Sequence, residues 1–226
     1  MIVVEKKPFE EIKKLVMPFK KVLVVGCGTC VAVCLSGGEK EAEILKNQLN
    51  LALGKEGYKF DHITLERQCD KEFLEELEDI SKDYDAFLSM ACGAGIQFLA
   101  EVYPEIPVLP AVNTNFIGVN KGVGWYEERC RACGNCVLGI TGGICPVTMC
   151  AKSLFNGPCG GTNKGKCEVN ENQPCAWYMI YERLSKQGRL EQILDIIPAN
   201  DWKTQGPRTI IQPGYEKLYD NNSLNK

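Results

Sequence analysis

Histidine is almost absent from this sequence: among 226 residues there is only one, His62. Metal sites and catalytic centres that need several imidazoles are therefore excluded. His62 lies inside a segment that we expect to form a strand, and there we expect an ordinary packed or surface side chain. Any metal in this protein must be held mainly by other ligands.

Two further features are missing, a charge imbalance and a long apolar run. Lys and Arg total 26 against 29 Asp and Glu, which leaves a net charge of -3 and no basic surface for nucleic acid or anionic lipid. No stretch approaches the roughly 18 apolar residues that span a bilayer, and the first residues lack the layout of a signal peptide. We expect a cytoplasmic protein without nucleic acid or membrane partners, and we find no motif for an active site of its own.

Cysteine, by contrast, is abundant, with 13 residues. In a reducing cytoplasm so many thiols are poor candidates for structural disulfides, and closely spaced thiols there are more often metal ligands or catalysts. Their positions relative to the expected secondary structure decide between these roles.

Short apolar runs alternate with amphipathic segments over the first half of the chain. We expect strands at residues 20–26, 58–68, 85–91 and 107–113, and helices at 8–17, 39–54, 71–84 and 96–104. This alternation predicts an α/β fold with a small parallel sheet, Rossmann-like or flavodoxin-like, covered by helices on both faces.

The expected helices also carry start signals and apolar faces. Ser36 and Glu39 have the spacing of a capping box, and Asp70 can cap the following helix. The apolar faces are formed by Ala42, Leu45, Leu49 and Leu53 in one helix and by Phe73, Leu77, Ile80 and Tyr84 in the next.

The composition changes near residue 120. We expect the α/β domain to occupy residues 1–120, and a cysteine-rich, ferredoxin-like domain to occupy 121–175. This second segment has few aliphatic residues for a core, so bound metal could supply stability. Residues 176–226 are expected to form a C-terminal helix and a tail that binds a partner.

The first cysteine group follows the first expected strand, in the stretch GCGTCVAVC. Gly26 and Gly28 resemble a dinucleotide-binding loop, but Val31 stands where its third glycine is required. The loop instead carries three thiols, and further cysteines follow the second and third strands. Because the carboxyl ends of parallel strands share one edge, we expect five cysteines to converge there: Cys27, Cys30, Cys34, Cys69 and Cys92.

Four of these thiolates would bind an iron–sulfur cubane. We prefer Cys92 as the fourth ligand, because Gly93 and Gly95 would let the backbone approach a bulky cluster. Cys69 stays an alternative, since it precedes a helix start and lies near Arg67 in the sequence.

The second group begins with the compact ferredoxin triplet, in which cysteines recur every third residue. A cysteine before Pro146 resembles the end of that motif, at a longer gap. The eight members suffice for two cubanes whose ligand division stays open: Cys130, Cys133, Cys136, Cys145, Cys150, Cys159, Cys167 and Cys175. We therefore expect three [4Fe-4S] clusters. Zinc is the alternative at any site, although it usually takes two separated C-x2-C pairs.

The stretch CGNCVLGITGGICPVTMCAKSLFNGPCGGTNKGKCEV resembles the small, cysteine-rich subunit of two-subunit methylenetetrahydrofolate reductases of acetogenic bacteria, a domain also found fused to the catalytic barrel. The resemblance extends to GCGTCVAVCLSGGEKE, ERQCD, MACGAGIQ and CAWYMIYERL, and so covers nearly all of the chain.

This resemblance implies a partnership. In that family a large flavin-containing subunit reduces 5,10-methylene-tetrahydrofolate to 5-methyl-tetrahydrofolate in the reductive acetyl-CoA pathway, and the small subunit is its metal-bearing partner. The chain would then pass electrons from ferredoxin or another donor module through its clusters to that flavin. Zinc has also been associated with the family.

Overall fold

The chain consists of two compact units, residues 1–129 and 130–226, in a computed structural model that describes residues 1–219. The unit boundary lies slightly beyond the domain boundary expected at 120. The last part of the predicted partner-binding tail, residues 220–226, lies outside the described residues.

The first unit is built on a parallel sheet of four strands, in the order β3 (Lys59–Leu65), β2 (Lys21–Cys27), β4 (Ala86–Ser89) and β5 (Val108–Pro110). The α/β fold and all four predicted strands are confirmed. The first strand of this sheet in chain order, β2, is an inner strand. The next strand, β3, lies at the edge, and β4 then lies on the other side of β2, so the strand order reverses between β2 and β4. Open sheets of this kind bind their ligands at such a reversal, beside the carboxyl ends of the strands.

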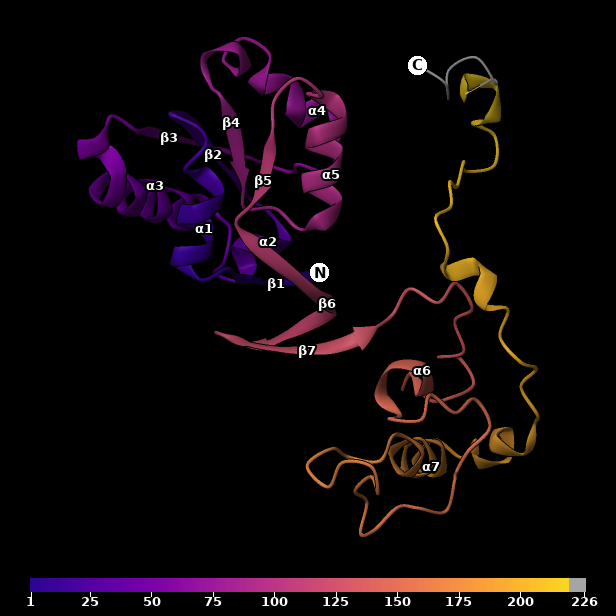
Figure 1. The fold of residues 1–226 in the computed structure, drawn as a ribbon. Coiled ribbons are helices and arrows are strands. Elements are labelled where there is room, and N and C mark those ends of the chain that lie inside the picture. The colour runs from indigo at the N-terminus through magenta and orange to yellow at the C-terminus, as the bar shows by residue number, and fades with distance from the viewer. Residues whose placement is uncertain (220–226) are drawn as a thin grey trace. The chain divides into compact units, whose positions relative to one another are not determined.

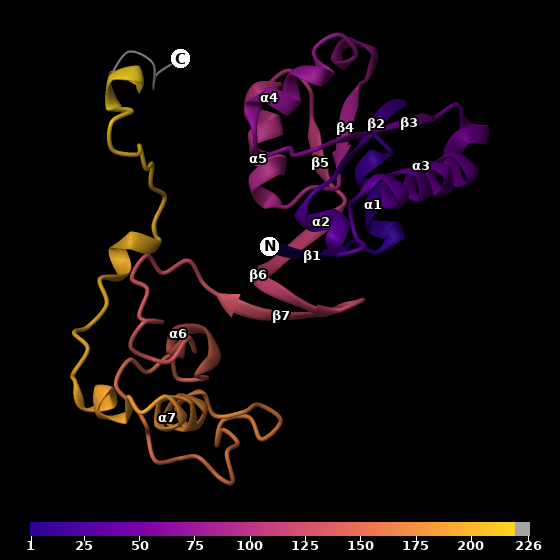
Figure 2. The same cartoon turned by 180° about the vertical axis from the view of Figure 1, so that it is seen from behind.

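Helices cover both faces of this sheet (Figure 2). Val22 and Val24 of β2 pack toward α1 (Phe9–Val16) and α3 (Glu39–Leu53), while Leu23 and Val25 pack toward the other face, with α4 (Lys71–Leu74) and α5 (Gly93–Val102). Burial on both faces explains why β2 is apolar throughout instead of alternating. The predicted face of α3 is buried as expected, at Ala42, Leu45, Leu49 and Leu53.

The helix expected over residues 71–84 is wrong in its length. α4 ends at Leu74, and two 3-10 turns follow, Glu75–Leu77 and Ser81–Asp83. Acidic residues recur three and four positions apart in this segment, and such like charges weaken a regular α-helix. Buried Leu74 and Leu77, three residues apart, suit the three residues per turn of a 3-10 helix.

The predicted cap at Ser36 is wrong, and the predicted cap at Asp70 is correct in position only. α3 begins after Gly38, whose N–H donates to the Glu41 carboxylate at 3.2 Å, whereas the Ser36 hydroxyl donates to the carbonyls of Val4 and Cys34. Asp70 stands at the cap position of α4, but its side chain makes no capping hydrogen bond. These side chains bind other parts of the chain, which sequence spacing could not reveal.

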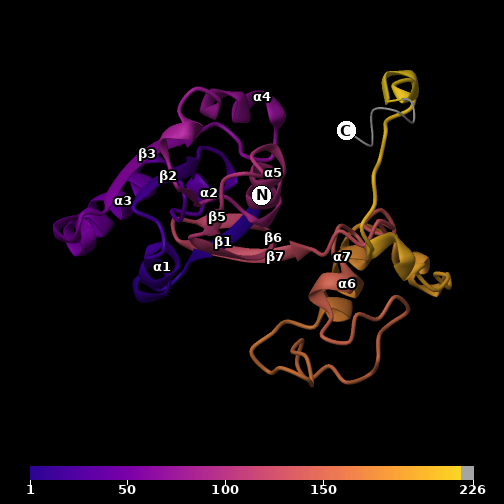
Figure 3. The same cartoon turned by 45° about the horizontal axis from the view of Figure 1, so that its top comes forward.

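A second, antiparallel sheet joins β1 (Ile2–Lys6), β6 (Val112–Gly122) and β7 (Trp125–Cys130), side by side in Figure 3. The sequence analysis missed β1 and β7, and it saw only the start of β6. Figure 1 shows α2 (Cys30–Val33), β1 and β6 gathered at one end of the parallel sheet. This is the end at which the cysteine loops lie.

The second unit consists mainly of loops. Its helices are α6 (Pro146–Met149) and α7 (Ala176–Lys186), and 3-10 turns follow at Leu190–Leu194, Trp202–Gln205 and Glu216–Tyr219; one further turn, Gly54–Glu56, belongs to the first unit. Within residues 130–219 the only β pairing outside β7 is two isolated bridges, so the ferredoxin-like arrangement is not confirmed. The core forms around Trp177, Ile180 and Leu184 of α7.

No helix in residues 1–219 combines the length and the apolar character needed to cross a bilayer.

Candidate functional site

The five cysteines of the first unit lie at the carboxyl ends of three neighbouring strands. Cys27 ends β2, and Cys30 and Cys34 begin and follow α2. Cys69 comes after β3, and Cys92 occupies the N-cap position of α5, three residues after the end of β4. Cys27, Cys34 and Cys92 are buried, while Cys69 is exposed.

Cys30 and Cys92 are in direct contact, although 62 positions separate them in the sequence. The Cys92 thiol donates a hydrogen bond to the Cys30 sulfur, and this bond lowers the pKa of Cys30 to about 5, against the opposing effect of burial. The same bond and burial raise the pKa of Cys92. The pair therefore brings two sulfur atoms with opposite pKa shifts together across the β2–β4 reversal.

Cys34 and Cys69 complete the group more loosely. Burial raises the pKa of Cys34, whose thiol donates to the Ile2 carbonyl at 3.4 Å and lies near enough to Cys30 for their charges to interact. Burial also raises the pKa of Cys69, with the charges of Cys27 and Cys30 adding to it. All five sulfur atoms thus belong to one cluster of interacting groups, with Cys92 in the closest contact.

The antiparallel sheet forms a lid on this cluster. Val4 of β1 and Val112 of β6 pack in one apolar group with Cys27 and Cys92. The lid is also hydrogen-bonded to the loops: the Gly93 N–H donates to the Thr114 hydroxyl at 2.8 Å, and the Tyr126 hydroxyl of β7 donates to the carbonyl of Val33 at 2.7 Å. The lid removes much of the thiol cluster from water.

Gln68 is a residue of this site that the sequence analysis missed. Its side chain is fully buried, and its Nε2 donates to the carbonyls of Val25 and Gly26, each at 2.9 Å. Its Oε1 accepts from the Ser89 hydroxyl at 2.6 Å. One amide thus ties the ends of β2 and β4 to the residue before Cys69. Gln68 follows Glu66 and Arg67 in a polar stretch, so its only signal in the sequence was its position directly before Cys69.

Of the two glycines after Cys92, Gly95 has a packing role that was not predicted. A Cβ on Gly95 would approach Ala91 at 2.9 Å and Gln68 at 3.0 Å, whereas one on Gly93 would meet only the Thr114 hydroxyl, at 3.6 Å. Gly95 therefore allows α5 to pack against the Gln68 loop. The interaction of Cys92 with Cys30 adds a second reason for preferring Cys92.

In the second unit, the triplet lies on one tight loop. The Ala132 N–H donates to the Cys130 sulfur at 3.3 Å, and the Cys133 thiol donates to the Asn135 carbonyl at 3.5 Å. Ala132 and Gly134 adopt left-handed backbone conformations, with φ of 52° and 82°. Cys136 ends the loop, and Cys145 caps α6 farther along the chain.

The other four cysteines line a single narrow cavity. Cys150 follows α6 and Cys175 precedes α7, and the loops between these helices bring the remaining two beside them: the cavity is lined by Cys150, Cys159, Cys167 and Cys175, with Lys152 and Glu168. Backbone hydrogen bonds hold this arrangement. The Cys167 N–H donates to the Gln173 carbonyl, and the Cys175 N–H donates to the Gly165 carbonyl.

The stretch NGPCGG owes its composition to this packing. The Asn156 amide makes two hydrogen bonds of 2.8 Å with the backbone of Ile197. Gly157 lies against the Trp177 ring, and a Cβ added to Gly157 would be only 2.5 Å from atoms of that ring. Gly160 has a φ of 78°, and a Cβ on Gly161 would collide with the Glu168 carboxylate. The loop therefore presents Cys159 to the cavity.

These donor sets fit a thiophilic metal or cluster in their chemistry, because each is made of sulfur and partly shielded from water. Within the described part of the chain, no three His, Cys, Asp or Glu side chains lie at the spacing that holds a single metal ion. The thiols of each group lie in the same region, but their sulfur atoms do not converge on one common centre.

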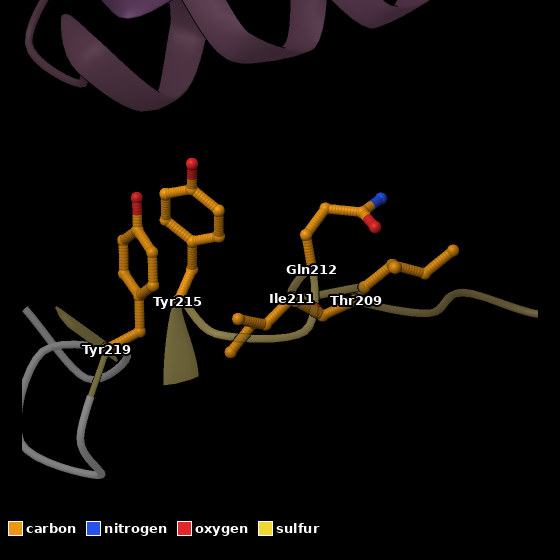
Figure 4. Close-up of a pocket in the computed structure, with 6 residues that line it drawn as sticks. Thr209, Ile211, Gln212, Tyr215 and Tyr219 are labelled. Carbon is orange, nitrogen blue, oxygen red and sulfur yellow. The ribbon is translucent and has the colours of Figure 1, made fainter. Parts of the chain in front are cut away.

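A wide hollow of about 560 Å³ lies away from the cysteines, in the tail of the second unit. Figure 4 shows five of its residues, Thr209, Ile211, Gln212, Tyr215 and Tyr219. The six lining residues include no cysteine and no Asp, Glu, Lys, Arg or His side chain, so this hollow offers a contact surface and not a metal site.

Comparison with known proteins supports one relationship. A family model described as "Methylene-tetrahydrofolate reductase C terminal" matches residues 109–203, less than half of the chain but including all eight cysteines of the second group. The match relates the protein to methylenetetrahydrofolate reductase and to one-carbon metabolism. No curated protein and no solved structure matches the chain.

Replacing Gln68 by leucine tests the role of its amide. Gln68→Leu should lower the free energy of unfolding by about 1–3 kcal/mol, because buried polar partners lose their hydrogen bonds. It should also speed thiol labelling of Cys27 and Cys92 as the strand ends loosen. Urea unfolding and timed labelling with mass spectrometry measure both effects. Gln48→Leu, on the exposed side of α3, is the matched control; equal behaviour of the two variants would contradict this role.

Proposed function

We propose that this chain is the electron-transfer subunit of a methylenetetrahydrofolate reductase. It passes electrons through iron–sulfur clusters to the flavin of a catalytic subunit, which reduces 5,10-methylene-tetrahydrofolate to 5-methyl-tetrahydrofolate. Ferredoxin or another donor module supplies the electrons. The relationship of residues 109–203 to the reductase supports the choice of enzyme.

The observation that carries the proposal is the contact between Cys30 and Cys92 at the reversal of the sheet. Cysteines from three different strand ends meet there, in a place where a parallel sheet commonly binds a ligand. Isolated buried thiols that merely pack would have no reason to converge. Four cysteine thiolates are the ligand set of an iron–sulfur cubane, which takes up and releases single electrons when bound.

We assign Cys27, Cys30, Cys34 and Cys92 to the first cluster, with Cys69 as the remaining thiol. The eight cysteines of the second unit would hold two more clusters. The chain's own contribution is burial and hydrogen bonding at the sulfur atoms: the lid excludes water from the first group, and backbone N–H groups such as that of Ala132 donate to sulfur in the second unit. Both factors set reduction potentials.

Metal analysis tests the proposal directly. Protein purified without oxygen should contain about twelve irons and a matching amount of sulfide per chain, because three cubanes take four irons each. Reduction should produce paramagnetic cluster signals. Two or three zinc ions without sulfide would contradict electron transfer and would instead indicate a zinc-binding assembly module.

The fourth ligand of the first cluster can be identified with two single variants. Cys92→Ser should remove about one third of the iron, because it removes a ligand, while Cys69→Ser should keep the full content. Iron and sulfide assays on both proteins give the result. The reverse pattern would assign Cys69 as the ligand. Full iron content in both variants would show that neither cysteine is needed to bind a cluster.

We further propose that the tail of the second unit binds the catalytic subunit. The tail is attached beside the Cys159 loop by the Asn156–Ile197 hydrogen bonds and by the edge contact of Phe155 with Trp202. Beyond this anchor, Ile210 and Leu218 are 69% and 68% exposed. Apolar side chains at this exposure are typical of a surface that another protein covers. A partner held there would be attached to the unit that carries the second group of cysteines.

Replacing tail side chains tests this docking surface. Ile210→Ala combined with Leu218→Ala should reduce copurification of the flavin subunit from the native cell at least tenfold, because the contact loses apolar burial. Iron content should not change. Leu51→Ala, on the 83% exposed position in α3, serves as a control. Unchanged copurification of the double variant would place the interface elsewhere.

A further inference from the structure

The Lys152–Glu168 ion pair lines the cysteine cavity of the second unit. Lys152 follows Cys150 by two positions, and Glu168 follows Cys167 directly. Both side chains also reach Cys159. The Lys152 ammonium lies 3.8 Å from the Cys159 sulfur, and the Cys159 thiol donates to the Glu168 carboxylate at 3.7 Å. The pair therefore connects three of the four cysteine-bearing segments.

The surrounding loop accommodates both charged side chains. A Cβ at position 161 would occupy the space of the Glu168 carboxylate, so the glycine of the NGPCGG loop leaves room for that group. Lys152 is the side chain that can reach both the carboxylate and the sulfur. By comparison, Lys166, also next to Cys167 in sequence, is exposed and lines no part of the cavity.

We propose that Cys150, Cys159, Cys167 and Cys175 form one metal centre, in which Lys152 and Glu168 are positioning residues that set the charge at the Cys159 sulfur. Cys130, Cys133, Cys136 and Cys145 then belong to a separate centre. This inference rests on the proposed function and assigns the ligand division that cysteine spacing leaves open.

The two charges act in opposite directions. An ammonium group beside a ligand sulfur stabilises the more negative, reduced state of the centre, and so raises its reduction potential. A carboxylate at the same sulfur opposes this effect. Because Lys152 and Glu168 are 40% and 45% exposed, salt partly screens both contributions. The centre should therefore respond to ionic strength more than one shielded by a lid.

Paired serine variants test the ligand division in the full chain. Cys159→Ser should lose one cluster's iron, and Cys159→Ser with Cys175→Ser should lose no more, because both ligands serve the same centre. Cys159→Ser with Cys133→Ser should lose twice as much. Additive loss within the first pair would overturn the division. If Cys159→Ser fails to fold, as judged by the near-ultraviolet signal of Trp177, Cys167→Ser replaces it in the same comparison.

Potentiometry tests the ion pair. Lys152→Met should lower the midpoint potential of one cluster, and Glu168→Gln should raise that of the same cluster, both with full iron content and both less at high salt. Lys166→Met is the matched control and should leave the potential nearly unchanged. Shifts of the same sign, no shifts, or metal loss in both variants would contradict the positioning role.

This inference can fail separately from the proposed function. If the purified chain holds zinc and no iron, electron transfer is refuted, and the ion pair is then tested in the Co²⁺-substituted protein. There, Lys152→Met and Glu168→Gln should shift the thiolate-to-metal charge-transfer bands in opposite directions. Unmoved bands would refute the role of the pair whichever metal is bound.

Discussion

The buried amide of Gln68 is the contact on which the first cysteine group depends. Backbone hydrogen bonds within the sheet fix the strands but not the loops that leave them, and it is the loops that carry the thiols. By accepting from Ser89 and donating to two carbonyls at the end of β2, Gln68 holds neighbouring strand ends in one arrangement. The Cys30–Cys92 contact lies directly beyond this arrangement. A buried amide with its hydrogen bonds satisfied is both stabilising and geometrically specific.

The second unit reaches a similar result without a sheet. It orders its thiols by glycines that permit close approach, by backbone bridges within loops, and by one tryptophan whose ring covers the Gly157 backbone. Its Trp177 indole N–H donates to the Leu154 carbonyl at 2.8 Å and so fixes the loop on α7. Such a unit buries few apolar side chains for its length, and metal binding would add stability that packing alone does not supply.

Much of the first unit could be predicted from sequence, because strands buried on both faces and an amphipathic helix have distinct periodicities. The convergence of cysteines followed from the geometry of parallel strands. The lid could not be predicted: β1 is short, and its partner β6 begins more than 100 residues later. The contacts of Gln68 and the sharing of one cavity by Cys150 and Cys175 also depend on tertiary packing. The spacing of residues along the chain does not determine these tertiary contacts.

The lid has a consequence for the order of events during synthesis. β1 is synthesised before the other strands of this unit, yet Ile2 pairs with Ile117, so β1 waits for most of the unit before it can join a sheet. Contacts this distant in sequence form late in folding. The parallel strands and their thiol loops can assemble earlier, and until the antiparallel sheet closes they remain open to solvent. If the first group binds a metal or cluster as we propose, delivery would have a natural interval, between completion of the parallel sheet and closure of the lid.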